Sequence, residues 1–202
     1  MSLTTPAADA RSHEILASIR QAFAKKGFDG ASMQDLARAV GMSVGNFYRY
    51  FPSKAAIVQA MCGYDLSEMQ AEFAEIEQSA QPMTCLRDRI LAHFDENALK
   101  DGQLWAEITA AAIRKPEIGL AAREMEETIK RLLATIFAAI TRRPVDEALV
   151  RYEGQCQMLI LLVKAMAVRT SQCGPAAPPL AAQVVAVVDR ILSEISDDVA
   201  EG

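Results

Sequence analysis

The sequence is poor in the residues that build metal and catalytic sites. It has only two histidines and four cysteines among 202 residues, and no two cysteines stand in a Cys-x-x-Cys pair. Neither His13 nor His93 has a glutamate three residues before it, so the Glu-x-x-His pattern of di-iron helical bundles is missing. A glycine-rich phosphate loop is missing as well. The sequence therefore predicts no enzyme, no cofactor and no bound metal.

Long apolar runs are also missing. The longest, Met158 to Val163, has six residues, whereas a membrane-spanning helix needs about 20. The segment from Met1 to Glu14 has no apolar stretch, so no signal peptide is expected. We therefore expect a cytoplasmic protein that does not enter a membrane. The four thiols, Cys62, Cys85, Cys156 and Cys173, are interpreted as buried or incidental, with a redox sensor at Cys173 as the alternative.

Strand patterns are not found either, and the apolar spacing is helical along nearly the whole chain. The sequence predicts an all-α protein in three parts. A disordered lead covers residues 1–10, a helix-turn-helix head of three helices covers 11–53, and a helical body for ligand binding and dimerisation covers 54–198. The body is divided by prolines. Its expected helices run from Lys54 to the late 70s and over about 83–99, 103–114, 117–142, 145–171 and 179–196.

Charge differs between the two ends of the chain, whose net charge is −5. Residues 1–60 carry seven basic and four acidic side chains, whereas the remainder carries 14 basic and 22 acidic ones. A small basic head on an acidic body is typical of a protein whose head meets phosphate groups and whose body does not.

The head contains two short helix signals on either side of a glycine turn. Ser32 and Asp35 form a capping-box start for the second helix, and Gly41 ends it. Ser43 is expected to cap a short third helix, which Pro52 closes. The core anchors of this third helix are predicted to be Phe47, Tyr50 and Phe51, with the Tyr50 hydroxyl able to stay at the surface. This order of features favours a helix-turn-helix, in which the later helix enters the major groove of DNA.

The third helix leaves hydrogen-bonding side chains on the face that its core does not need. Its N-terminus attracts phosphate, and Gly45 lets the backbone approach a duplex closely. Asn46 suits bidentate pairing with adenine, and Val44 suits a thymine methyl group. A surface helical hairpin that binds no DNA is the alternative. The further predicted DNA contacts are Tyr48, Arg49 and Lys54, with Ser32 and Gln34 at the start of the second helix.

Residues 11–60 resemble the N-terminal domain of TetR/AcrR-type transcriptional regulators. The motif that carries the resemblance is Gly41-x-Ser43-x-Gly45-x-x-Tyr48-x-x-Phe51-x-x-Lys54, preceded by Lys26-Gly27-Phe28 and Asp35-Leu36-Ala37. The resemblance implies DNA contacts by Ser43, Gly45, Asn46, Tyr48, Arg49 and Lys54. It also implies a homodimer, a ligand cavity in the body, and repression that a small molecule relieves. Val44 departs from the family pattern, which often has a basic residue at that position.

The last two predicted helices are apolar on more than one face. Met158 to Val163 covers every face of a helix, and a helix that is apolar all round must be buried all round. We therefore expect one face to pack inward and another to pack against a second copy, although a monomeric bundle with a central helix is the alternative. The predicted dimer contacts are Met158, Leu161, Leu162, Ala165, Val184, Val188, Ile191 and Leu192.

The ligand site is the least specified part of the sequence. Candidates combine apolar surface with polar tips, as small-molecule sites do, although each of them also fits an ordinary core position. Glu107 beside Trp105 suits a cationic ligand, and His93 is placed to titrate near neutral pH. The candidates are Tyr64, Met69, His93, Phe94, Trp105, Glu107, Ile108, Met125, Gln155 and Met158.

Together these patterns predict a sequence-specific DNA-binding regulator of transcription. We expect it to be a repressor, and to be released from a palindromic double-stranded operator when an unknown small molecule binds in the body. The alternative is an all-α module that binds protein or small molecules and has no affinity for DNA.

Overall fold

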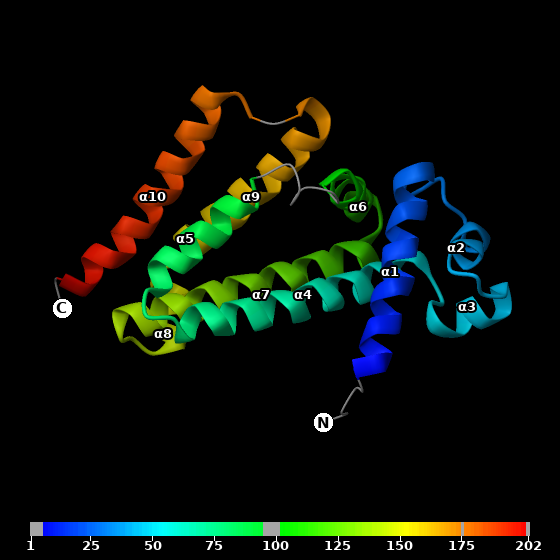
Figure 1. The fold of residues 1–202 in the computed structure, drawn as a ribbon, viewed down its shortest axis with the longest axis horizontal. Coiled ribbons are helices and arrows are strands. Elements are labelled where there is room, and N and C mark those ends of the chain that lie inside the picture. The colour runs from blue at the N-terminus through cyan, green and yellow to red at the C-terminus, as the bar shows by residue number, and fades with distance from the viewer. Residues whose placement is uncertain (1–5, 95–101, 175, 201–202) are drawn as a thin grey trace. The chain divides into compact units, whose positions relative to one another are not determined.

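The computed structural model describes residues 6–94, 102–174 and 176–200. All regular structure in these ranges is α-helical, which confirms the predicted all-α class. Figure 1 shows the helices in chain order. They are α1 Pro6–Lys26, α2 Met33–Ala39, α3 Val44–Tyr50, α4 Lys54–Gln78, α5 Pro82–Ala92, α6 Gly102–Arg114, α7 Pro116–Thr141, α8 Val145–Arg151, α9 Glu153–Cys173 and α10 Pro178–Ala200.

The chain forms two compact units. The first unit consists of the described part of Met1–Asp65 together with Gln103–Arg123, and so contains α1, α2, α3, the beginning of α4, nearly all of α6 and the beginning of α7. The second unit consists of the described part of Leu66–Gly102 and of Glu124–Gly202. The first unit therefore contains more than the predicted head, because it includes a segment about 40 residues further along the chain.

Helix α1 begins earlier than the sequence predicted. Residues 6–10, which we expected to belong to a disordered lead, form its first turns, while residues 1–5 lie outside the described ranges. Pro6 occupies the first helical position, where its missing N–H costs nothing, and three of the next four residues are alanine. The local helix propensity of this segment was therefore underestimated.

The core of the first unit is aromatic and aliphatic. Ile19 and Phe23 of α1 are buried, as their spacing predicted, and Gly27 ends the helix with a positive φ of 77°. Phe28 folds back onto the same core, with its ring centroid 5.0 Å from that of Phe23. Helix α2 contacts both α1 and α3, and Figure 1 shows α2 and α3 as a pair of short helices beside α1.

The second unit has a continuous apolar core built from α4, α5, α7, α8, α9 and α10. Helix α10 contacts α5 and α9. The α5–α10 pair is also joined by a bidentate ion pair, in which Arg87 Nε lies 2.5 Å from Asp189 Oδ1 and Nη2 lies 3.1 Å from Oδ2. This arrangement buries the inner face of α10 within a single copy of the chain.

That burial corrects half of the predicted dimer contacts. Four residues of α10 are 0–7% exposed and belong to the protomer's own interior, so their side chains are not available to a partner: Val184, Val188, Ile191 and Leu192. The α9 residues differ, since Met158 and Leu161 are 47% and 56% exposed, Ala165 is exposed and Leu162 is half-buried. The sequence showed that α10 is apolar on several faces but not which of them the protomer itself covers.

The predicted helix over 145–171 is two helices. It breaks at Tyr152, whose φ of −107° and ψ of 20° are not helical. The Tyr152 ring is buried and meets Phe137 edge-on at 5.8 Å, and its hydroxyl donates a hydrogen bond to Asp198. The break thus coincides with the buried contacts of this one side chain, and the local sequence has no proline at this point.

Two smaller predictions concern thiols and membranes. Cys62 and Cys156 are buried, Cys85 is half-buried and Cys173 is exposed. Burial raises the pKa of the Cys156 thiol to about 12, so this thiol is protonated near neutral pH. In the described ranges, no helix has the combination of length and apolarity that crossing a bilayer requires.

Candidate nucleic-acid interface

Side-chain caps fix the starts of both short helices of the head. The Ser32 hydroxyl accepts from the Asp35 amide at 3.1 Å, and Asp35 Oδ2 accepts from the Ser32 amide at 3.0 Å, which confirms the predicted capping box. Ser43 Oγ accepts from the Asn46 amide at 3.3 Å at the start of α3. The Ser53 hydroxyl likewise accepts from the Ala56 amide at 3.1 Å and caps α4. These caps hold α2 and α3 as two rigid elements.

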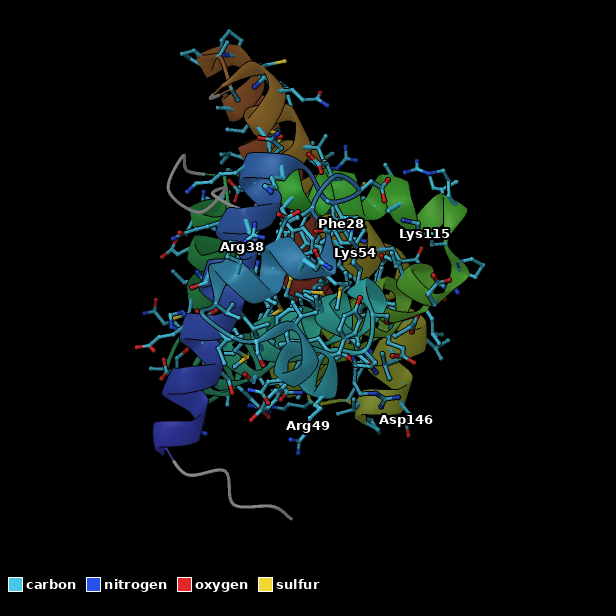
Figure 2. All side chains as sticks on the ribbon, turned by 90° about the vertical axis from the view of Figure 1, so that its right-hand side faces the viewer. Phe28, Arg38, Arg49, Lys54, Lys115 and Asp146 are labelled. Carbon is cyan, nitrogen blue, oxygen red and sulfur yellow. The ribbon has the colours of Figure 1, made fainter. Side chains whose placement is uncertain are left out.

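Helix α3 has one buried residue and a wide exposed face. Phe47 is fully buried, whereas Val44 and Tyr48 are 38% and 46% exposed. Asn46 and Arg49 are exposed too, and Figure 2 shows Arg49 pointing away from the ribbon. A Cβ built on Gly45 meets no atom within 4 Å, so open space lies next to the backbone there. The predicted DNA-reading residues of α3 therefore share one accessible surface, to which exposed Ser43 at the cap is adjacent.

Tyr50 was predicted to be a core anchor, and this was wrong. Its side chain is 62% exposed, and the position next to Phe47 is taken by Phe51, whose ring centroid lies 5.3 Å away. On a helix, positions three and four residues after a buried anchor compete for the same neighbour, and here the residue four positions on is the one that packs. Tyr50 thus joins the exposed polar surface of α3.

Helix α2 adds a further cation that the sequence reasoning missed. The Arg38 side chain is 77% exposed, and its Nη1 lies 3.5 Å from Asp35 Oδ1. Ser32 and Gln34, which were predicted to contact DNA, are exposed at the start of the same helix. The available signal was spacing, because Arg38 follows the exposed Gln34 by four residues and so lies on the same helical face. Figure 2 labels Arg38 and Arg49, the two exposed arginines of this helix pair.

Lys54, which was predicted to contact phosphate, makes contacts within the first unit. Its ammonium donates to the carbonyl oxygens of Phe28 at 2.7 Å and Asp29 at 2.9 Å, and it lies 5.5 Å from the centroid of the Phe28 ring. Burial, and then the neighbouring Lys115 charge, lower the pKa of Lys54 below its ordinary value. These contacts join Lys54, at the start of α4, to the turn between α1 and α2, and Figure 2 labels Lys54 close to Phe28.

We expect Lys54→Met to lower the free energy of unfolding by about 1–3 kcal/mol, because two carbonyl oxygens lose a charged donor. Urea denaturation followed by circular dichroism measures this. Lys25→Met, at an exposed lysine of α1, is the matched control and should change stability by less than about 0.5 kcal/mol. Unchanged stability together with a shallower salt dependence of DNA affinity would instead favour the phosphate contact.

The predicted ligand residues of the first unit are used in packing. The Tyr64 ring stacks on His13 at 5.3 Å, and Arg20 lies 5.9 Å from the centroid of the Trp105 ring. Ile108 is fully buried. Glu107, which we predicted to meet a cationic ligand, instead accepts a hydrogen bond from the Phe28 amide. These side chains already have partners inside the unit.

The predicted ligand residues of the second unit lie in varied places. His93 caps the C-terminal end of α5, and its pKa is lowered by burial and then by Arg89, against a smaller opposing effect of Glu72. Met158 is exposed and Gln155 donates to Glu194 at 3.3 Å. Met69 and Phe94 pack against the apolar core, and Met125 is half-buried.

One surface cavity in the second unit has a volume of about 430 Å³, and of the predicted ligand residues it contains only Gln155. Its lining residues are Arg151, Tyr152, Gln155, Glu194, Asp197 and Asp198. This charged and polar lining differs from the mixture of apolar surface and polar tips that the sequence predicted. Within the described ranges, no group of three or more histidine, cysteine, aspartate or glutamate side chains is arranged to hold a metal ion.

Comparison with known proteins matches the head directly. Residues 15–61 match the family described as "Bacterial regulatory proteins, tetR family". The chain is 28% identical over 120 residues to the HTH-type transcriptional regulator UidR of Escherichia coli, covering 59% of this chain and 61% of UidR. It is 30% identical over 88 residues to the HTH-type transcriptional regulator TtgR of Pseudomonas putida, covering 43% of this chain and 42% of TtgR. The matched part thus spans about 61% of the length of UidR and less of TtgR.

Solved structures share the fold over nearly the full chain. Salmonella enterica GusR superposes with a TM-score of 0.69 at 22% identity, covering 95% of this chain and 98% of that one. A transcriptional regulator FadR from Bacillus subtilis in complex with stearoyl-CoA superposes with a TM-score of 0.62 at 17% identity, covering 92% and 98%. At these identities the likeness establishes the fold, and the sequence match at residues 15–61 confirms the predicted resemblance.

Proposed function

We propose that this chain, which is a TetR-type regulator by its matched N-terminal residues and its fold, binds DNA in the cytoplasm as a sequence-specific homodimer and controls transcription. The observation that carries the proposal is the surface of α3. Phe47 alone is buried there, while Val44, Asn46, Tyr48 and Arg49 are accessible. The relatives with this type of head are named as transcriptional regulators rather than enzymes, which supports the same conclusion.

In the proposed complex, α3 enters the major groove with its capped N-terminus toward the duplex. Gly45 allows the backbone to approach the bases, Asn46 reads a base edge, and Val44 contacts a thymine methyl group. Tyr48 and Arg49 bind phosphate oxygens, or a guanine edge in the case of Arg49. Two such helices in a dimer would bind half-sites roughly 34–36 Å apart, or somewhat further for a longer spacing, so the operator is expected to be palindromic.

Asn46→Ala and Arg49→Ala are expected to have different effects on DNA binding. Losing the Asn46 amide should relax the preference at one base pair of each half-site by about 1–3 kcal/mol. Losing Arg49 as a phosphate contact should weaken binding to all sequences. It should also reduce the slope of log affinity against log salt concentration by about 1 for each head. Selection from random duplexes, followed by fluorescence anisotropy at several salt concentrations, measures both effects. An unchanged sequence preference in Asn46→Ala would show that Asn46 does not read bases.

The function as a whole is tested by a salt titration on a nonspecific duplex. A head that neutralises phosphates should lose affinity steeply as the salt concentration rises, because binding releases counterions. The alternative, a helical module that binds protein or small molecules, predicts no affinity for duplex at any salt concentration. Sequence-specific binding is then shown if the selected operator displaces the nonspecific duplex from the protein at a much lower concentration than a scrambled operator does.

We base the proposed dimer on the exposed face of α9. Met158, Leu161, Leu162 and Ala165 are spaced by three and four residues along one helical face, and none of them is fully buried in the protomer. Such spacing is typical of a seam between helices. A large apolar face of this kind is costly in water, and a second copy of the chain is the simplest partner that would cover it.

We further propose that a small molecule bound by the second unit controls DNA affinity. The solved FadR structure contains stearoyl-CoA, so a protein of this fold holds a small molecule. In this chain, binding would act only through the difference in ligand affinity between the DNA-competent form and the other form. A ligand that favours the other form releases the operator, which is repression relieved by an effector.

A further inference from the structure

The turn between α1 and α2 is held by side chains from distant parts of the first unit. Lys54 donates to the carbonyl oxygens of Phe28 and Asp29 in this turn. The turn also contacts residues at the end of α6. Arg114 Nη2 lies 2.8 Å from Asp29 Oδ2, and Lys115 Nζ lies 2.6 Å from Asp29 Oδ1. About two helical turns before Arg114 on α6, Glu107 accepts a hydrogen bond from the Phe28 amide.

The contact of Glu107 with Phe28 replaces a bond that helix ends usually make internally. After a left-handed glycine such as Gly27, the next amide commonly bonds to a carbonyl of the helix that has just ended. Here the Phe28 amide donates to Glu107 of α6 instead. A Cβ built on Gly27 would lie 3.4 Å from Glu107 Oε2, so the carboxylate sits directly over the turn.

The turn determines where the DNA-reading helices begin. The Ala31 amide donates to the Gly27 carbonyl at 3.1 Å, and Ser32 directly after it caps α2. Helix α2 in turn contacts α3. A shift of the Phe28–Asp29 turn would therefore move the start of α2 and, through its packing, the exposed face of α3.

We propose that Glu107 is a positioning residue for DNA binding, because it holds the Phe28 amide from α6 and so fixes the turn from which the α2–α3 pair starts. The proposal deepens the proposed function and depends on it. It assigns Glu107 a role in joining α6 to the DNA-reading helices, in place of the ligand contact expected from the sequence. Movement of α6 would then change the presentation of α3 without any contact between α6 and DNA.

Glu107 is expected to matter more than the neighbouring ion pairs. The Asp29, Arg114 and Lys115 side chains are 53%, 58% and 39% exposed, so their attraction is screened by water and salt. Lys115 above all, and Arg114, hold the pKa of Asp29 below its ordinary value. The Glu107 bond is half-buried and charge-assisted, and removing the carboxylate leaves an amide without its acceptor.

The test uses the full chain with Glu107→Ala, Glu107→Gln and the control Glu124→Ala, which removes an exposed glutamate from α7. Hydrogen exchange reports on residues 27–40, and anisotropy measures affinity for the selected operator. In Glu107→Ala we expect exchange in this segment to accelerate, and operator affinity to fall, by about tenfold each, with the melting temperature lowered by about 3–6 °C. Glu107→Gln should retain most of the slow exchange and most of the operator affinity of the wild type, because its amide oxygen still accepts the Phe28 N–H.

Several outcomes would overturn the proposal. Faster exchange with unchanged operator affinity would show that the bond is real but does not position the DNA-reading helices. Weaker binding with unchanged exchange, or an equal loss in Glu124→Ala, would show that Glu107 acts only through its charge. Unchanged exchange and affinity in Glu107→Ala would remove the role altogether. If the wild type binds no duplex, the proposed function fails, and the exchange measurement alone then decides whether Glu107 fixes the turn.

Discussion

Replacing Phe47 by alanine is expected to lower the free energy of unfolding by about 3–5 kcal/mol, because it leaves a cavity at a fully buried site. Phe47 is the single buried residue of α3, so its ring is what attaches this helix to the rest of the first unit. DNA binding should be lost together with the fixed orientation of α3. Urea denaturation gives the stability change, and anisotropy on the selected operator gives the affinity.

Tyr50→Ala is the matched comparison for Phe47→Ala, because it removes another aromatic ring three residues further along the same helix. With a side chain that is 62% exposed, it should cost no more than about 0.5 kcal/mol of stability. A loss comparable to that of Phe47→Ala would mean that Tyr50 is an anchor after all. A stable Tyr50→Ala protein with weaker DNA binding would place Tyr50 in the interface.

If the proposed dimer forms through α9, Leu161→Glu is expected to convert it into monomers and to weaken operator binding by about 10²–10⁴-fold. The substitution would bring a carboxylate from each copy into an apolar seam, where an unpaired charge is strongly unfavourable. DNA affinity falls because two linked heads bind with a high effective concentration, and separated heads lose that advantage. Sedimentation equilibrium measures the oligomeric state, and circular dichroism checks that the monomer is folded.

Val150→Glu provides the control for the dimer prediction. Val150 is an apolar residue of α8 that is 80% exposed, so the same change of chemistry occurs outside the α9 face. This variant should remain dimeric and bind the operator normally. If Leu161→Glu stays dimeric while Val150→Glu dissociates, the interface lies on α8 rather than along Met158, Leu161 and Ala165.

Caps and turns of the head were predictable because they depend on neighbours in sequence. The capping box of Ser32 and Asp35, the cap at Ser43 and the left-handed Gly27 each involve residues within four positions of one another. The exposed face of α3 followed from the same short-range spacing. Tyr50 failed because two aromatic residues, at three and four positions after Phe47, satisfied the same pattern and only packing selected Phe51.

The second unit was less predictable because its residues meet neighbours far along the chain. Val188, Ile191 and Leu192 looked the same in sequence as an interface stripe, yet the protomer buries them itself. At the helix break, the Tyr152 hydroxyl donates a hydrogen bond to Asp198, which is 46 residues away. The ligand candidates had the right composition for a cavity, but composition does not state which side chains will find partners inside the protein.

The sequence by itself determined the helical class, the starts of the short helices and, apart from Tyr50, the polar residues that α3 exposes, because these follow from local periodicity and capping. Only the tertiary structure decided which apolar faces remain uncovered and where charged side chains are directed. Lys54 and Glu107 illustrate the reason: each carries a charge that chain-local reasoning assigns to an external partner. Each instead meets the backbone of Phe28, which is 26 residues from Lys54 and 79 residues from Glu107 along the chain. Local sequence patterns cannot predict contacts between residues so far apart.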